Sequence, residues 1–123
     1  MSTPTQRALA ELRKLGATAA IVERWNAFAK LRQDLFGFVD VLAIVGGNIV
    51  AVQVTSGANH AARRSKILAE PRALAWLKAG GLIEIWSTSK KGAKGKRKLW
   101  KIRKEPIVLE DFAPELIEVR EAS

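Results

Sequence analysis

The sequence contains no cysteine and no tyrosine, and only one histidine, His60, in 123 residues. The lack of cysteine excludes disulfide bonds and thiolate zinc sites, and a single histidine excludes a multi-histidine metal centre. No apolar run reaches the roughly 18 residues that a membrane-spanning helix needs, and the N-terminus lacks the apolar core of a signal peptide. These absences predict a cytoplasmic protein that does not associate with membranes.

Acidic residues are scarce in most of the chain. Residues 1–104 carry a net charge of +14 and residues 105–123 carry −5, which gives +9 overall. The stretch 90–104 holds nine Lys or Arg and no acid. Such a field favours a polyanion, because each neutralised phosphate releases condensed counterions. A solvated basic loop, or a ribosome-like or membrane-surface patch, would have the same composition.

The apolar pattern predicts a single α/β domain over residues 1–123, with a mixed sheet and helices on both faces. We divide it into a core (about 5–89), a basic hairpin (90–104) and an acidic C-terminal tail (105–123). The expected elements, in chain order, are a helix at 5–15, a strand at 17–25, a connection with some local helix at 26–37, strands at 38–45 and 49–55, a helix at 58–79 interrupted near Pro71, strands at 82–89 and 98–104, and a short helix within 109–121.

Three polar side chains interrupt the two apolar strands at 38–55: Asp40, Gln53 and Thr55. A two-residue turn at Gly46–Gly47 would place Asp40 opposite Gln53, whereas a turn at Gly47–Asn48 would place it opposite Thr55. Gln53 and Thr55 share a face of their strand, so the three side chains cluster in either register.

The cluster has two interpretations. Carboxylate, amide and backbone oxygens are ligands that Mg²⁺ or Mn²⁺ prefers, and such a metal activates water and neutralises charge on a phosphate. Alternatively, Asp40 accepts hydrogen bonds from Gln53 and Thr55 in a satisfied buried network without a metal.

The order of elements over residues 5–89 resembles that of the PD-(D/E)XK nuclease superfamily, the restriction-endonuclease-like and Holliday-junction-resolvase-like enzymes. Asp40 matches the PD aspartate, and Gln53–Val54–Thr55 stands at the (D/E)XK tripeptide. The stretches RQDLFGFVDVLAI and VQVTSG are also similar to small nuclease-like proteins of bacteriophages. Phe38–Val39 replaces the proline-containing approach to the aspartate, Gln53 replaces an acid, and Thr55 replaces the motif lysine.

This resemblance implies a restriction-endonuclease-like fold and a Mg²⁺- or Mn²⁺-dependent endonuclease that cuts DNA, with branched DNA as the substrate class and a homodimer as the assembly. It implies metal ligands at Asp40, the Gln53 side-chain oxygen and the Val54 carbonyl, with Glu11 or Glu23 as the second acid. Thr55 would position water. The missing lysine would be replaced from a neighbouring element by one of four basic residues: Lys66, Arg63, Lys30 or Arg32.

Two other functions stay open. Gln53 and Thr55 favour a catalytically inactive nuclease-fold protein that binds DNA or inhibits a partner, and the basic charge also fits an RNA- or ribosome-associated module.

Candidate nucleic-acid contacts lie in the loop before Asp40, at the start of the helix after Thr55, and in the basic hairpin; they are Arg32, Gln33, Asp34, Ser56, Asn59, His60, Arg63, Lys90, Lys91, Lys94, Lys96, Arg97, Lys98 and Trp100. Capping of the helix is the preferred role of Ser56 and Asn59, and a hydrogen bond at the helix start or a phosphate contact is that of His60. Trp25 is a second candidate for stacking on bases, while Trp76 and Trp86 are assigned to the core.

Overall fold

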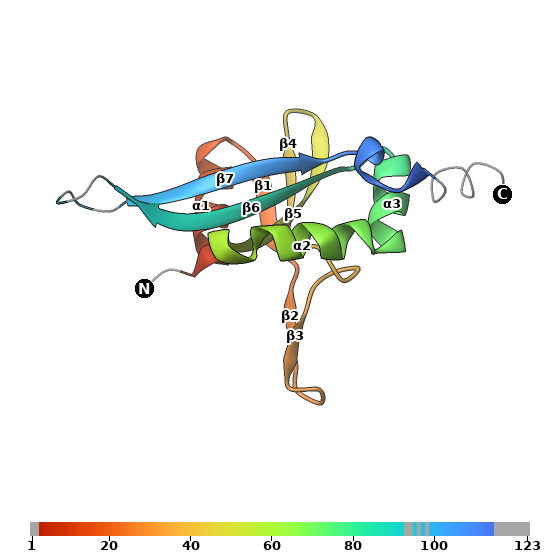
Figure 1. The fold of residues 1–123 in the computed structure, drawn as a ribbon, viewed down its shortest axis with the longest axis horizontal. Helices are drawn as coiled ribbons and strands as arrows, with labels where there is room; N and C mark the ends of the chain where they lie inside the picture. The colour runs from red at the N-terminus through yellow and green to blue at the C-terminus, as the bar shows by residue number, and fades with distance from the viewer. Residues whose placement is uncertain (1–2, 93–94, 96, 98, 115–123) are drawn as a thin grey trace.

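The computed structural model describes residues 3–92, 95, 97 and 99–114. Its centre is a five-stranded mixed sheet in the order β1-β4-β5-β6-β7, with helices on both faces (Figure 1). The elements are α1 (Pro4–Lys14), β1 (Thr18–Ile21), β2 (Arg24–Asn26), β3 (Leu31–Gln33), β4 (Val41–Val45), β5 (Asn48–Ser56), the 3₁₀ turn η1 (Gly57–Asn59), α2 (His60–Leu68), α3 (Pro71–Lys78), β6 (Leu82–Lys91), β7 (Leu99–Ile107) and the 3₁₀ turn η2 (Leu109–Asp111). The predicted α/β class is confirmed. Within the described residues, no helix is long and apolar enough to cross a membrane.

Helix α1 begins and ends where the sequence indicates. The Thr3 hydroxyl accepts from the Gln6 backbone N–H, and the Gln6 side chain accepts from the Thr3 N–H, which forms a capping box. Gly16 follows the helix with φ +84°, a value that glycine adopts without strain. Ala8 and Leu12 of this helix are buried against Val52 and its neighbours on one face of the sheet.

The β4–β5 hairpin takes the first of the two predicted registers. Gly46 and Gly47 both have positive φ, and Val45 pairs with Asn48 across a two-residue turn. Val50, Val52 and Val54 therefore face α1, while Ala51 joins the core beneath α2 and α3. The expectation that helices cover both faces of these strands is confirmed.

The parallel strands β5 and β6 are joined through α2 and α3. Pro71 is the first residue of α3, and the Glu70 side chain caps that helix by accepting from the Arg72 N–H at 3.1 Å. The predicted interruption of the helical segment at Pro71 is confirmed. Ile67 of α2 and Leu74 of α3 are buried in the core on this side.

The prediction of local helix in residues 26–37 is wrong. Strands β2 and β3 instead form a separate two-stranded hairpin that projects from the body of the molecule (Figure 1). Two local features reverse the chain there. The Asn26 side-chain oxygen accepts from the Phe28 and Ala29 N–H groups at 2.9 and 3.0 Å, and Lys30 has φ +55°.

The basic segment does form a hairpin, since β6 and β7 pair antiparallel out to Lys91 and Leu99. Beyond β7, the 3₁₀ turn η2 ends at Asp111 and Pro114 is helical, which fits the expected start of the C-terminal helix; residues 115–121 of that prediction lie outside the described residues.

Candidate functional site

Three carboxylates from separate parts of the chain meet beside the sheet. One oxygen from each of Glu23, Asp34 and Asp40 lies within 4.8 Å of the other two. Glu23 follows β1, Asp34 follows β3, and Asp40 precedes β4. The loops around these strands thus place an acidic cluster at one side of the five-stranded sheet.

A tight loop brings Asp34 and Asp40 together. Leu35 and Val39 exchange backbone hydrogen bonds of 3.0 and 2.9 Å, so Asp34 and Asp40 are the next residues outward from this antiparallel bridge and lie across from each other. Phe36 and Gly37 turn the chain between them with φ of +54° and +79°. The third acid is held close because Val22, next to Glu23, donates its N–H to the Asp40 carbonyl at 2.9 Å.

Asp40 is buried, with 4% of its surface exposed. Its Oδ2 accepts from the Gln53 Nε2–H at 2.5 Å and from the Val54 N–H at 2.7 Å. The predicted pairing of Asp40 with Gln53 is confirmed. Within the described part of the chain, no hydrogen bond joins Thr55 to Asp40, although Thr55 is buried on the same face of β5 as Gln53.

The side-chain oxygen of Gln53 is buried beside Asp40's hydrogen-bond partner Nε2 and lacks a partner of its own in the described part of the chain. Gln53 is 1% exposed, and its Oε1 has no hydrogen-bond partner among the described residues. A buried carbonyl oxygen without a partner costs on the order of 1–3 kcal/mol. The buried network with Asp40 therefore gives the Gln53 Nε2–H a partner but, within the residues that the structure describes, leaves the Gln53 Oε1 without one.

Burial raises the pKa of Asp40 from its ordinary value of 3.8 to about 8. The next cause is a hydrogen bond with Asp34, and the charges of Asp34 and Glu23 act in the same direction, whereas the Val54 N–H opposes them. The cluster therefore retains a proton at neutral pH, since three adjacent carboxylates repel one another.

These donors fit a hard divalent cation. Carboxylate and carboxamide oxygens are the ligands of Mg²⁺ and Mn²⁺, and Gln53 Oε1 is an oxygen in need of a partner. A cation there would also offset the repulsion by Asp34 and Glu23 that contributes to the raised pKa of Asp40.

Glu11, one of the two acids considered for the metal, does not reach this cluster. It extends from α1 on the other face of the sheet and accepts a hydrogen bond from Lys104 Nζ at 2.9 Å. That hydrogen bond lowers the pKa of Glu11. Its placement as a ligand is therefore wrong, and of the two acids only Glu23 joins Asp40.

Asp34 was not among the expected ligands, although the sequence offers a signal for it. It stands six residues before Asp40, and the intervening LFGFV contains the glycine that closes the loop.

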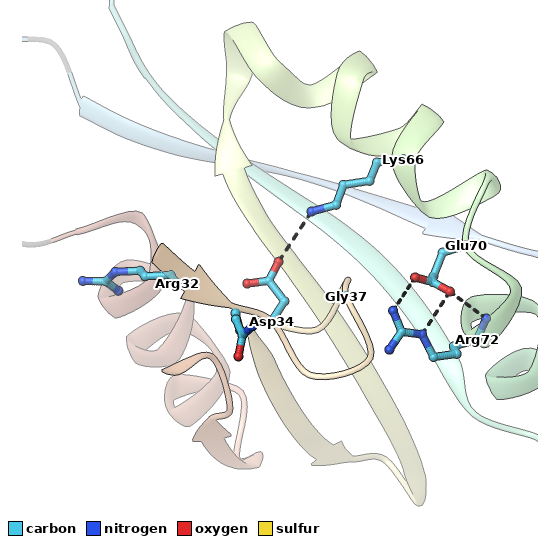
Figure 2. A pocket seen from close by; sticks show the side chains of 7 residues that line it. Arg32, Asp34, Gly37, Lys66, Glu70 and Arg72 are labelled. Carbon is cyan, nitrogen blue, oxygen red and sulfur yellow. Dashed lines mark hydrogen bonds and ion pairs between the residues drawn. The ribbon is translucent and has the colours of Figure 1, made fainter. Parts of the chain in front are cut away.

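A pocket of about 550 Å³ opens beside the acidic cluster, and Figure 2 shows Asp34 pointing across it toward Lys66 of α2. Lys66 Nζ lies 3.9 Å from Asp34 Oδ2, and Arg32 Nη1 lies 3.0 Å from Glu23 Oε1. Two of the four predicted substitutes for the motif lysine are thus at the cluster. Lys30 lies toward the tip of the β2–β3 hairpin, and Arg63 lies one turn before Lys66 in α2. The pocket is lined by Arg32, Gln33, Asp34, Gly37, Lys66, Glu70 and Arg72.

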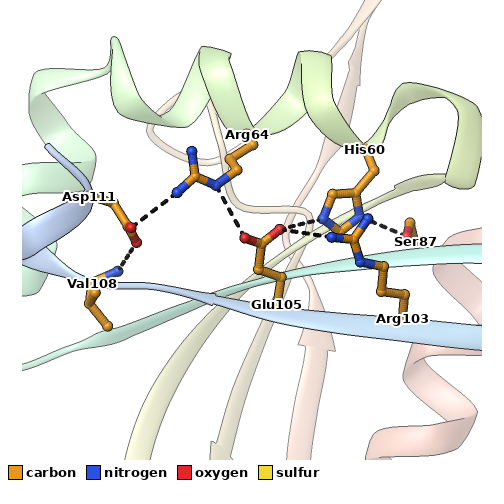
Figure 3. Close-up of polar contacts among 7 residues, drawn as sticks. All are labelled: His60, Arg64, Ser87, Arg103, Glu105, Val108 and Asp111. Carbon is orange, nitrogen blue, oxygen red and sulfur yellow. Dashed lines mark hydrogen bonds and ion pairs between the residues drawn. The ribbon is translucent and has the colours of Figure 1, made fainter.

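The predicted phosphate contact of His60 is wrong, because the ring is buried. His60 Nδ1 lies 2.7 Å from Ser87 Oγ and Nε2 lies 2.6 Å from Glu105 Oε1 (Figure 3). Arg64 extends the network from Glu105 to Asp111. These contacts tie α2 to β6, β7 and η2. The expected hydrogen bond at the helix start is the role that the structure gives His60.

Ser56 and Asn59 occupy cap positions without side-chain capping bonds; Asn59 Nδ2 instead donates to Ser56 Oγ at 3.2 Å. Capping was therefore the wrong role for both side chains.

The basic hairpin carries Trp100 on the α1 face of the sheet. Its ring is 46% exposed, with the Arg7 guanidinium 3.5 Å and the Lys90 ammonium 5.2 Å from the ring centroid. Lys90, Lys91 and Arg97 are exposed, whereas Lys94, Lys96 and Lys98 lie outside the described residues. Arg7 and Lys90 thus gather around Trp100 on the face of the sheet opposite the acidic cluster, whereas Lys91 lies beside Gly57 and Arg103.

Comparison of the chain with models of protein families, with curated proteins and with solved structures found no match.

Proposed function

We propose that this chain is a metal-dependent endonuclease that hydrolyses phosphodiester bonds in DNA. The observation that carries the proposal is the convergence of Glu23, Asp34 and Asp40, next to a pocket flanked by Lys66 and Arg32. Gln53 contacts this cluster through its hydrogen bond to Asp40, and its Oε1 is buried without a partner among the described residues. Asp40 is buried, and a buried carboxylate is costly unless it is paired or binds a cation.

The resemblance to the PD-(D/E)XK superfamily supplies the reaction. The restriction-endonuclease-like arrangement is part of this proposal, and it is supported by the order of α1, the Asp40 strand, the Gln53 strand and α2. Branched DNA as substrate and a homodimer that cuts two strands come from the same resemblance.

Each side chain then has a definite task. Glu23, Asp34, Asp40 and Gln53 Oε1 would hold Mg²⁺ or Mn²⁺, with the Val54 carbonyl as a further oxygen. The bound ion would lower the pKa of a coordinated water and neutralise charge on the phosphate. Lys66 approaches Asp34 from α2 and would contact the phosphate in place of the motif lysine. Arg32 would position the phosphate from the other side of the cluster.

A DNA-binding protein without catalysis is the alternative, favoured by Gln53 and Thr55 at the tripeptide. Gln53 brings an oxygen but no charge, so the site has one acid fewer at this position than the motif prescribes. Glu23 and Asp34 offset that loss, which is why we place catalysis first.

The test is a cleavage assay on labelled duplex, nicked, forked and four-way DNA with Mg²⁺, Mn²⁺ or EDTA. We expect cutting that requires metal and disappears in Asp40→Asn and Lys66→Ala, while Glu11→Gln cuts like the wild type. Retained DNA binding without cutting under any metal would overturn the nuclease and leave the DNA-binding alternative. A preference for single-stranded RNA over every DNA form would overturn both and favour the RNA-associated module.

A further inference from the structure

The β2–β3 hairpin stands directly on the acidic cluster. Arg24 pairs with Gln33, so the next residues outward from the ladder, Glu23 and Asp34, form the base of the hairpin. Figure 1 shows the hairpin projecting from the body of the molecule, away from the β4–β5 turn. Anything bound at the carboxylates therefore lies at the foot of this projection.

The outer part of the hairpin exposes large apolar side chains. Phe28 at its tip is fully exposed at 102%, and Trp25 and Leu31 are 61% and 46% exposed. Isolated apolar residues on a surface need no explanation, but three of them on one short projection indicate a contact site. The hairpin contributes nothing to the two buried core clusters, so these residues do not serve packing.

The charge of the hairpin identifies the kind of partner. Residues 24–33 contain Arg24, Lys30 and Arg32 and no acid. Aromatic side chains interleaved with cations are the composition that binds nucleic acids, because the cations follow the phosphates while the rings stack on bases. Proteins that insert apolar side chains between base steps unstack and kink the duplex in this manner.

We infer that the β2–β3 hairpin is a DNA wedge, with Phe28 and Trp25 inserted at an unstacked base step beside the phosphate held at the carboxylates. The inference rests on the proposed function for the position of that phosphate. Arg24 and Lys30 contact the flanking backbone, and Arg32 links the wedge to Glu23. Phe28 and Trp25 thereby select DNA whose bases already unstack, such as forks and junctions.

The length of the hairpin also limits how far the unstacked base step lies from the cut. Phe28 is five residues beyond Glu23, which spans at most about 17 Å in an extended strand. Adjacent phosphates of one strand are about 3.4 Å apart along the duplex axis, so the unstacked step lies within about five base pairs of the cut.

The experiment uses the full chain carrying Asp40→Asn, which we expect to bind without cutting, and forked DNA with 2-aminopurine at successive positions on both sides of the fork point. Unstacking raises the fluorescence of 2-aminopurine. The test variants are Phe28→Ala and Trp25→Ala. The matched control is Ile49→Ala, which shortens a 50% exposed apolar side chain next to the β4–β5 turn. Because all three side chains are exposed, the variants should fold.

We expect the fluorescence to rise within about five nucleotides of the cut, and we expect Phe28→Ala to abolish the rise. The same variant should weaken binding to forked DNA by about ten-fold, with a smaller loss on plain duplex, whereas Ile49→Ala changes neither.

If Phe28→Ala behaves like Ile49→Ala while the wild type still cuts, the wedge is overturned and the nuclease stands. If the wild type never cuts but the Phe28-dependent rise persists, the nuclease is overturned and the DNA contact stands. If Phe28→Ala instead lowers the mass of the DNA-free protein in solution and leaves the fluorescence unchanged, the tip is a subunit contact and the wedge is overturned.

Discussion

Gln53 and Asp40 face each other at the end of the β4–β5 ladder, and the Gln53 Nε2–H donates to Asp40 Oδ2 at 2.5 Å. This bond fixes which end of the amide points at the carboxylate. The Gln53 oxygen is consequently turned away from Asp40, and it finds no partner among the described residues. A residue that departs from the nuclease motif thus contacts the acidic cluster through its Nε2–H and keeps a buried oxygen without a partner, in the described part of the structure, next to that contact.

Substitution of Gln53 tests that oxygen directly. Gln53→Met keeps the length of the side chain but removes the oxygen, so Mn²⁺ affinity should fall by at least about ten-fold. Gln53→Glu adds a negative charge, so Mn²⁺ affinity should rise, while the metal-free protein becomes less stable because a fourth carboxylate joins the cluster. Isothermal titration with Mn²⁺ measures both. Equal affinities in wild type and Gln53→Met would show that the oxygen is no ligand.

Asp40→Asn should stabilise the metal-free protein. Burial, first of all, raises the pKa of Asp40 to about 8, so folding takes up a proton between pH 4 and 8. The cost of Asp40 to stability is therefore absent at pH 3 and grows as the pH rises toward 8. Asparagine removes this cost, and we expect a gain on the order of 2 kcal/mol at pH 8.

Urea unfolding in EDTA at pH 5 and pH 8 measures this gain, which should be larger at pH 8. Glu110→Gln, which removes an exposed acid, is the matched control and should change little. Mg²⁺ should stabilise the wild type but not Asp40→Asn. An Asp40→Asn variant less stable than the wild type at pH 8 would contradict the conclusion that the ionised Asp40 side chain destabilises the metal-free protein.

The choice between the two glutamates gives a paired test. Glu23 lies in the cluster, whereas Glu11 is bonded to Lys104 on the other face of the sheet. Glu23→Gln should therefore reduce Mn²⁺ affinity and cleavage by more than about ten-fold, and Glu11→Gln should leave both unchanged. The same titration and cleavage assay apply to both variants. Loss of metal binding in Glu11→Gln would contradict the site.

The sheet and its central polar pair could be predicted because they follow from local pattern. The glycine-rich turn limits the hairpin to two registers, and in either one Asp40 faces a polar side chain of β5; the structure selects the register that places Gln53 rather than Thr55 opposite Asp40. The boundary at Pro71 is equally local, because proline fits the first turn of a helix.

The β2–β3 hairpin and the role of His60 could not be predicted in the same way. Residues 26–37 have no apolar period, and their reversal depends on one Asn26 side chain and a positive φ at Lys30. The environment of His60 depends on Glu105, which is distant in sequence and reaches it only through the pairing of β7 with β6. The resemblance implies an acid on the first helix and so points to Glu11, yet which face of the sheet α1 covers is a property of the whole fold.

Gly37 should tolerate no side chain. Its φ is +79°, and an added Cβ would lie 2.7 Å from Arg72 Nη2 and 2.9 Å from Glu70 Oε1. Both atoms belong to flexible side chains, so they can move, but the backbone strain remains at about 1 kcal/mol or more. Gly37→Ala should therefore lower stability by about 1–2 kcal/mol and displace Asp34 relative to Asp40.

Thermal unfolding and Mn²⁺ titration of Gly37→Ala check both effects. Gly57→Ala is the control, because its Cβ would meet the nearest atom at 3.5 Å, an ordinary contact. If Gly37→Ala keeps both its stability and its Mn²⁺ affinity, the loop does not set the geometry of the acids.

Glu105 links stability to pH away from the proposed site. It accepts from His60 Nε2 at 2.6 Å and from Arg64 Nε at 3.2 Å, and the hydrogen bond from His60, followed by that from Arg64, lowers the pKa of Glu105. A carboxylate with a lowered pKa contributes stability above its unfolded value of 4.5, and this contribution is lost as the pH falls through the folded value.

Glu105→Gln should accordingly cost about 1–2 kcal/mol at pH 7, because two bonds to a charged acceptor are weakened beside a buried imidazole. The difference from the wild type should shrink as the pH falls from 7 toward 3, because the contribution of the lowered pKa of Glu105 is lost in that direction. Urea unfolding at pH 7 and pH 3, followed by tryptophan fluorescence, measures it, with Glu110→Gln as the control for loss of one negative charge. An equal difference at both pH values would show that Glu105 acts through packing rather than through its charge. Cleavage at pH 7 should be retained, because the network ties α2 to β7 and contains none of the residues around Asp40.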